Sequence, residues 1–336
     1  METYTLLLRA GPALLISFAV AVMLSPIVIS SALKLKVGQP ILSYVEQHAD
    51  KQGTPTFGGI IFLFPALFVT IAFTSGEGIS IGTIAAIVML SFAVLGFLDD
   101  FIKVKMKDNM GLRPYQKIIG QIAIAVIVSV YAYQNADIGS SVIIPFFGIT
   151  FELGIWYIPF AAFVFLALSN CVNLTDGIDG LASNCSLVYF ITFIVVLFFD
   201  RSSGSKNDTL IIFASATVGG LLAFLLVNTN KASVFMGDTG SMALGGASAA
   251  LALFSKRPLL VLFVGIMYVV SGISIILQVA YFKITHGKRI FLMSPYHHHL
   301  EKKGKSEAQI CNLYATVSLL MGVISIISVA VEKNGF

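Results

Sequence analysis

Long apolar runs, separated by short polar segments, recur along the whole chain. An α-helix needs roughly 20 mostly apolar residues to cross the hydrocarbon core of a bilayer, and most of these runs approach that length. The pattern predicts an all-α, polytopic membrane protein that forms one integral membrane unit over residues 1–336. Ten spans are predicted, at 11–33, 56–74, 79–98, 118–135, 156–172, 185–199, 209–227, 241–255, 258–282 and 311–331.

Three local signals refine this pattern. Residues 140–154 alternate between apolar and polar positions and contain proline and glycine, which predicts a short hairpin or interfacial strand pair rather than another span. Ser271-Gly272 predicts a bend within the long ninth span. Ser306 and Gln309 have the spacing of a capping box, so they predict where the tenth helix begins.

Composition supports a membrane location, and the distribution of charge predicts the orientation. The chain is 57% hydrophobic and only 11% charged, whereas soluble domains carry about a quarter charged residues. Of 21 Lys and Arg residues, 15 fall in loops that the ten spans place on one side. The positive-inside rule puts these loops in the cytoplasm and both chain ends outside. The cytoplasmic loops are 34–55, 99–117, 171–184, 228–240 and 283–310.

Two groups of acids stand in or beside these loops. Asp99 and Asp100 end the third predicted span, where carboxylates oppose the helix dipole and therefore suggest a functional role. Adjacent helical side chains point about 100° apart, so the two carboxylates need not share one metal. One acid can bind a cation or a hydroxyl while the other acts as a base. Asn173, Asp176 and Asp179 lie three residues apart and would form a slanted polar ridge if helical. Loop 171–184 contains no Lys or Arg, so a cation or the substrate must compensate these charges.

Two further clusters follow. Asp238 begins the eighth span, where helix N–H groups favour anions; the alternative is that it only caps the helix. Phe235, one turn before it, could stack on the base of a nucleotide; the alternative is ordinary packing in the core or at the membrane edge. Three consecutive histidines at 297–299 cannot all face one ion, so they are better suited to donate hydrogen bonds to a pyrophosphate. Unpaired acids, glycine-rich turns and basic groups together favour Mg²⁺-assisted phosphoryl transfer, and their position at the membrane edge implies a lipid substrate.

Several motifs then match a known family. The chain carries, in order, GTPTFGG, DDFIK with GLRPYQK, NLTDGIDGLA, VFMGDTGS and PYHHHLE. Over nearly its whole length it resembles the polyprenyl-phosphate N-acetylhexosamine-1-phosphate transferases. The Pro-x-His-His-His-x-Glu string at 295–301 resembles the branch that uses UDP-N-acetylmuramoyl-pentapeptide rather than the N-acetylglucosamine branch. The resemblance implies transfer to undecaprenyl phosphate with Mg²⁺, which yields lipid I and UMP for peptidoglycan synthesis. It also implies a homodimer in the bacterial inner (plasma) membrane.

The same resemblance implies roles for individual residues. Asp238 corresponds to the metal-binding acid, and Asp99 and Asp100 to acids near the lipid phosphate, with Asp100 the candidate base. His297 and His298 join these three as candidate catalytic residues. The positions that correspond to the uridine pocket are Asp179, Asn228, Phe235 and Gln278, and those that correspond to other polar residues of the cleft are Lys51, Thr56, Lys117, Asn173 and Asp176.

Three alternatives remain open from the sequence. Transfer by direct attack of the lipid phosphate competes with a phospho-aspartyl intermediate, which would give ping-pong kinetics. An enzyme that uses UDP-N-acetylglucosamine is the nearest rival function. A transporter that relays protons would place acids near the middle of the membrane, whereas these acids gather at one edge.

Overall fold

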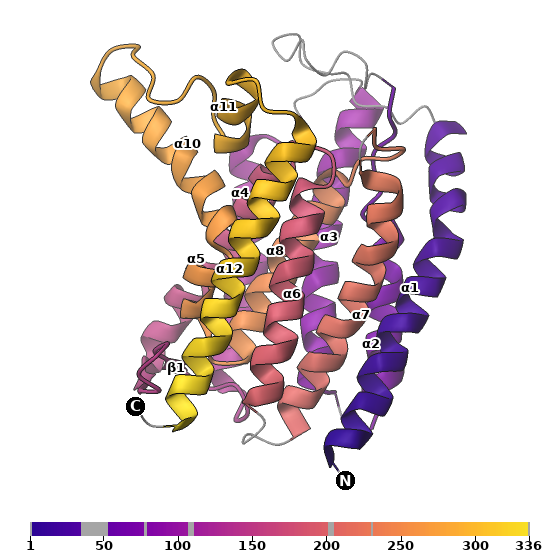
Figure 1. Cartoon of the computed structure of the whole chain (residues 1–336), viewed down its shortest axis with the longest axis vertical. Helices are drawn as coiled ribbons and strands as arrows, with labels where there is room; N and C mark the ends of the chain where they lie inside the picture. The colour runs from indigo at the N-terminus through magenta and orange to yellow at the C-terminus, as the bar shows by residue number, and fades with distance from the viewer. Residues whose placement is uncertain are drawn as a thin grey trace.

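The computed structural model describes residues 2–34, 53–76, 79–106, 111–200, 205–229 and 231–334 as an elongated bundle of helices (Figure 1). The first turn of α1 and the last turn of α12 lie at the same end of this bundle, and α11 lies at the other end. The helices are α1 Glu2–Lys34, α2 Ile60–Thr74, α3 Ile81–Met106, α4 Pro114–Gln134, α5 Tyr157–Thr175, α6 Leu181–Phe199, α7 Ser205–Asn228, α8 Gly237–Phe254, α9 Val261–Val264, α10 Ile266–Ile284, α11 Tyr296–Lys302 and α12 Glu307–Asn334.

Eight of the described helices are long and apolar enough to cross a bilayer. They are α1, α3, α4, α5, α6, α7, α10 and α12, and the segment that contains α5 begins at Gly154. The predicted spans 56–74 and 241–255 correspond to α2, which has 15 residues, and to α8, which has 18. The multi-pass, mostly helical architecture is therefore confirmed. The number of ten crossings and the orientation in the membrane stay predictions.

The ninth predicted span differs from the expectation. It consists of the 3₁₀ turn Pro258–Leu260, the short helix α9 and the helix α10, and the chain breaks between the helices at Gly265. Ser271 and Gly272 both lie inside α10, and the bend expected there stays a prediction. A Cβ at position 272 would lie 2.4 Å from the sulfur of Cys171, so this glycine allows α10 to approach α5 closely.

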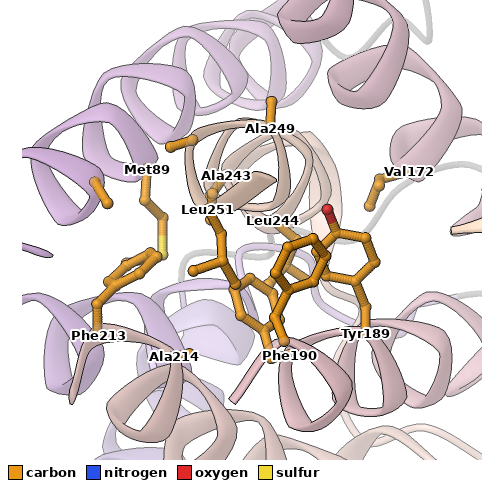
Figure 2. Close-up of a cluster of buried hydrophobic side chains, with 14 of the residues drawn as sticks. Met89, Val172, Tyr189, Phe190, Phe213, Ala214, Ala243, Leu244, Ala249 and Leu251 are labelled. Carbon is orange, nitrogen blue, oxygen red and sulfur yellow. The ribbon is translucent and has the colours of Figure 1, made fainter. Parts of the chain in front are cut away.

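Helix α8 forms the centre of the bundle. It is rich in Ala, Gly and Ser, and every residue from Thr239 to Phe254 is buried. It packs on α3, α5 and α6, and Figure 2 shows large side chains such as Phe190, Phe213 and Tyr189 gathered around it. Small residues allow helix backbones to approach closely, so the first turn of α8 is held firmly in the middle of the protein.

Two local predictions are confirmed. The segment 140–154 contains an antiparallel pair, β1 Ser141–Ile143 and β2 Thr150–Glu152. At the start of α12, Ser306 N donates to Gln309 Oε1 at 3.0 Å and Gln309 N donates to Ser306 Oγ at 3.3 Å, which is the predicted capping box.

Buried ion pairs tie helices together at the hairpin end. The Arg257 guanidinium donates to Asp200 at 2.9 Å and to Glu332 at 2.8 Å. All three residues are buried or nearly so. This contact joins the segment that follows α8 to the end of α6 and the end of α12.

Candidate functional site

Three carboxylates from distant parts of the chain meet in one place. Asp99 and Asp100 lie near the end of α3, and Asp238 lies in the first turn of α8. One carboxylate oxygen from each lies within 4.8 Å of the others. Since Asp238 follows Asp100 by 138 residues, only the tertiary fold brings these groups together.

Glycine allows α3 to reach the start of α8. A Cβ at Gly96 would lie 2.1 Å from the carbonyl oxygen of Asp238, so a larger residue would push the two helices apart. Gly237 has a φ of +73°, and a Cβ there would lie 2.6 Å from both Asp100 Oδ2 and Thr56 Oγ1. Glycine tolerates this left-handed conformation without steric cost. The two glycines therefore hold the α3 acids against the N-terminus of α8.

Asp100 caps the N-terminus of α8 from a neighbouring helix. Its Oδ1 accepts from Asp238 N at 3.1 Å, and its Oδ2 accepts from Thr239 N at 2.9 Å and Thr239 Oγ1 at 2.7 Å. The Asp100 side chain is fully buried. A carboxylate there satisfies free N–H groups and complements the helix dipole. Asp100 thus fixes the backbone of Asp238, and its role as a base stays a prediction.

Asp238 does not act as a cap itself. No side chain of the N-cap residue of α8 caps the helix, and the Asp238 carboxylate turns instead to other partners. Its Oδ1 accepts from Asn173 Nδ2 at 2.7 Å, and its Oδ2 contacts Lys103 Nζ at 2.9 Å and Lys117 Nζ at 2.8 Å. Burial alone would raise the pKa of Asp238, but the hydrogen bond with Asp99 and the two ammonium groups outweigh it and hold this pKa well below its usual range.

Lys103 is a central residue for which the sequence predicted no role, although it stands within the DDFIK string. Its ammonium lies 2.6 Å from Asp99 Oδ2 and 2.9 Å from Asp238 Oδ2. The available signal was the i,i+4 spacing from Asp99, which brings two side chains onto one face of a helix. Asp99 Oδ1 also accepts from Leu112 N at 2.8 Å, which attaches the segment before α4 to the site.

The acids of loop 171–184 do not form the helical ridge considered from the sequence. Helix α5 ends at Thr175, so Asn173 lies in its last turn and Asp176 is its C-cap. The Asp176 carboxylate makes no hydrogen bond or ion pair within the described residues, and burial raises its pKa well above the usual range, with the nearby acids adding to the rise. Asp179 turns away, and its Oδ2 accepts from Ala232 N at 2.9 Å.

Two predicted substrate residues use their side-chain amides to hold the protein's own backbone. Asn228 accepts from Gly180 N at 3.2 Å and donates to Val234 O at 3.0 Å. Gln278 accepts from Phe291 N at 2.9 Å and donates to Phe291 O at 3.0 Å. Both residues therefore position the loops that border the site, and contact with a substrate stays a prediction for each.

Of three further residues predicted to bind substrate, the structure describes two. The Thr56 hydroxyl is buried beside Gly237 and has no hydrogen-bond partner within the described residues. Phe235 is half-buried, and its backbone N donates to Pro55 O at 2.8 Å. Lys51 lies outside the described residues.

The three histidines of α11 diverge. His297 is fully buried, and a Cβ at Gly177 would lie 2.4 Å from His297 Nε2 and 3.3 Å from His298 Nε2. The Nδ1 of His298 lies 2.5 Å from Glu301 Oε2. His299 points elsewhere and accepts from Leu292 N at 3.0 Å. The first two histidines therefore adjoin the loop that carries Asp176, whereas the third holds the loop before α11.

The donor groups of this site suit a divalent cation and phosphate. Carboxylate oxygens are the ligands that Mg²⁺ prefers, and three of them converge here from Asp99, Asp100 and Asp238. Lys103 and Lys117 provide two ammonium groups that can bind phosphate oxygens. The arrangement can therefore hold a metal ion and stabilise a negatively charged transition state.

Comparisons with known proteins agree on one family. The model described as glycosyl transferase family 4 matches residues 81–256. The phospho-N-acetylmuramoyl-pentapeptide-transferase of Clostridium novyi is 42% identical over 323 residues, which cover 96% of this chain and 97% of that protein. The proteins of the same name from Desulfitobacterium hafniense and Clostridium perfringens are 41% and 44% identical, and each match covers at least 93% of both chains.

Proposed function

We propose that this chain moves phospho-N-acetylmuramoyl-pentapeptide from its UDP carrier to undecaprenyl phosphate. The reason is that it belongs to glycosyl transferase family 4 and to the phospho-N-acetylmuramoyl-pentapeptide transferases. The products are lipid I and UMP. The observation that carries the proposal is the meeting of Asp99, Asp100 and Asp238 with Lys103 and Lys117 at one end of the bundle.

The reaction forms one phosphorus–oxygen bond and breaks another. An oxygen of the lipid phosphate attacks the phosphorus that bears the sugar, and the bond from that phosphorus to UMP breaks. Lys103 and Lys117 bind phosphate oxygens and orient the donor, since phosphoryl transfer depends mainly on positioning and electrostatics. Asp238, with Asp99 beside it, would hold Mg²⁺, which when bound supplies positive charge that screens two anionic reactants.

The demand on a base is small. A phosphate monoester has a second pKa of about 6 and is already mostly ionised at pH 7. We keep Asp100 as the candidate base, and His297 and His298 as groups that contact the pyrophosphate near Gly177. The proposal of direct attack predicts no labelled enzyme when the donor is supplied without lipid, whereas a phospho-aspartyl intermediate would accumulate label.

We also propose that the site faces the cytoplasm of a bacterial cell, because the loops at this end carry most of the Lys and Arg residues. The nucleotide-linked donor would then reach the site from water and the lipid acceptor from the membrane. The homodimer stays a prediction.

The decisive test is UMP release by the purified protein. We expect release that requires both added lipid phosphate and Mg²⁺, and that is faster with the muramoyl-pentapeptide donor than with UDP-N-acetylglucosamine. Asp238→Asn should abolish release, whereas Asp137→Asn, which changes an exposed acid beside the hairpin, should not. Near-normal turnover by Asp238→Asn would show that Asp238 does not hold an essential metal ion. Faster release from UDP-N-acetylglucosamine would show that this nucleotide-sugar is the donor.

A further inference from the structure

A groove separate from the acid cluster opens between α10, the loop that follows it and α11. It encloses about 560 Å³, which is within the usual range for ligand sites. Three of its lining residues are cations: Lys283 at the end of α10, Arg289 in the loop and Lys302 at the end of α11. None of the three forms an ion pair within the described part of the chain. Like charges that share a groove without an acid repel one another, so an anionic ligand would stabilise it.

Apart from the cations and the polar residues Gln278 and Ser294, the walls of this groove are apolar, and they are firmly held. Val279, Phe282, Leu292 and Met293 line it beside the cations. The Gln278 amide fixes the loop wall to α10, because it bonds both the N–H and the carbonyl of Phe291. The bond from Leu292 N to His299 fixes the same loop to α11. The groove is thus preformed, with alkyl and aromatic surface between fixed positive charges.

Helix α11 connects the groove to the site. His298, near its start, adjoins Gly177 in the loop of Asp176. Lys302 follows His298 by four residues, so the two side chains lie on the same face of α11, about 6 Å apart along its axis. A ligand whose phosphates contact the histidines can therefore extend along this helix into the groove.

We propose that this groove binds the peptide of the donor substrate, with Lys283, Arg289 and Lys302 pairing with peptide carboxylates. This inference rests on the proposed function, under which the donor carries a pentapeptide on its sugar. A peptide of five residues spans up to about 17 Å when extended, which is enough to leave the site and reach Lys302. Its alkyl side chains suit the apolar walls, and its terminal carboxylate suits the cations. The groove would then distinguish a donor with a peptide from one without.

The test compares two nucleotide-sugars and two triple variants in the purified full-length protein. The groove variant combines Lys283→Gln, Arg289→Gln and Lys302→Gln. The control variant combines Lys105→Gln, Lys303→Gln and Lys305→Gln, which removes the same charge from exposed residues that do not line the groove. For each protein, kcat and KM are measured for UDP-N-acetylmuramoyl-pentapeptide, and KM is measured for the lipid acceptor. The inhibition constant is measured for the same nucleotide-sugar without its peptide, used as a competitor.

We expect the groove variant to raise KM for the pentapeptide donor roughly tenfold, since each partly exposed charge pair contributes modestly. The inhibition constant of the peptide-free competitor and kcat should stay within about twofold, which also shows that the variant is folded. The control variant should leave all four values unchanged.

Other outcomes overturn the proposal. If the groove variant bound both nucleotide-sugars equally more weakly, the cations would contact the nucleotide. If only the KM for the lipid acceptor rose, the groove would bind a lipid headgroup. An unchanged KM in the groove variant, or an equal rise in the control, would show that the groove does not bind the peptide, while the proposed activity would stand. If the unaltered protein released no UMP from either donor, the proposed function itself would fail.

Discussion

Replacing Asp100 by asparagine tests whether this acid holds the start of α8. The carboxylate accepts three hydrogen bonds from the first turn of α8, two from backbone N–H groups and one from Thr239 Oγ1. Asparagine has one acceptor oxygen and would turn its NH₂ group toward these donors. A buried hydrogen bond to a charged group contributes about 1.5–3 kcal/mol, and one acceptor oxygen remains, so we expect Asp100→Asn to lower the free energy of unfolding by about 3–5 kcal/mol.

The assay is thermal unfolding of the purified protein in detergent. For a chain of this size, about 1 kcal/mol corresponds to roughly 2 °C, so we expect Asp100→Asn to lower the apparent Tm by about 6–10 °C. Asp99→Asn is the matched control, because an asparagine oxygen can still accept from Leu112 N while Lys103 keeps its contact with Asp238. We expect Asp99→Asn to lower the apparent Tm by about a third as much as Asp100→Asn does. If Asp100→Asn melts like the unaltered protein, or if Asp99→Asn loses as much, Asp100 does not hold α8.

Three further predictions concern other contacts. Gly96→Ala should lower the rate of UMP release at least tenfold, because its methyl group would overlap the backbone of α8. Such overpacking lowers the stability of the folded state by about 1–3 kcal/mol or more. Gly11→Ala is the control, since a Cβ there meets no atom within 4 Å. Arg257→Met should cost about 3–5 kcal/mol and lower the apparent Tm, because it leaves two buried carboxylates unpaired; an unchanged Tm would contradict this. Trp156, the single tryptophan and 73% exposed, should lie at the membrane–water interface, so lipids brominated near the headgroup should quench its emission more than lipids brominated at the chain ends; the reverse order would refute this position.

Hydrophobic patterning predicted where helices exist better than where they end. The apolar run of the third span stops at 98, but α3 continues to Met106, because the end of this helix is polar and carries Asp99, Asp100 and Lys103 into the site. The same reason explains why α8 begins at Gly237, four residues before the predicted span. The close contact of Gly272 with Cys171 could not be predicted, because it depends on a partner that is remote in sequence.

The residue types of the site were evident from the sequence, but their pairings were not. Asp99, Asp100 and Asp238 stand out because acids at a membrane edge are costly. Which carboxylate caps α8 and which receives the lysines depends on how α3 packs against α8, and local spacing does not contain that information. Asn228 and Gln278 show the same limit, since a polar residue beside a site can hold a loop as readily as a ligand.

The burial of α8 has a consequence for how the protein is made. Its small residues give it little apolar surface, and it is not among the eight helices that meet the length and hydropathy expected of a span. Lipid alone would retain such a helix weakly, so its insertion depends on neighbours that are already in the membrane. We expect the nascent chain to seat α8 late, after α3, α5 and α6 have assembled. Asp238, in the first turn of this helix, would then reach its partners only after α8 has been inserted.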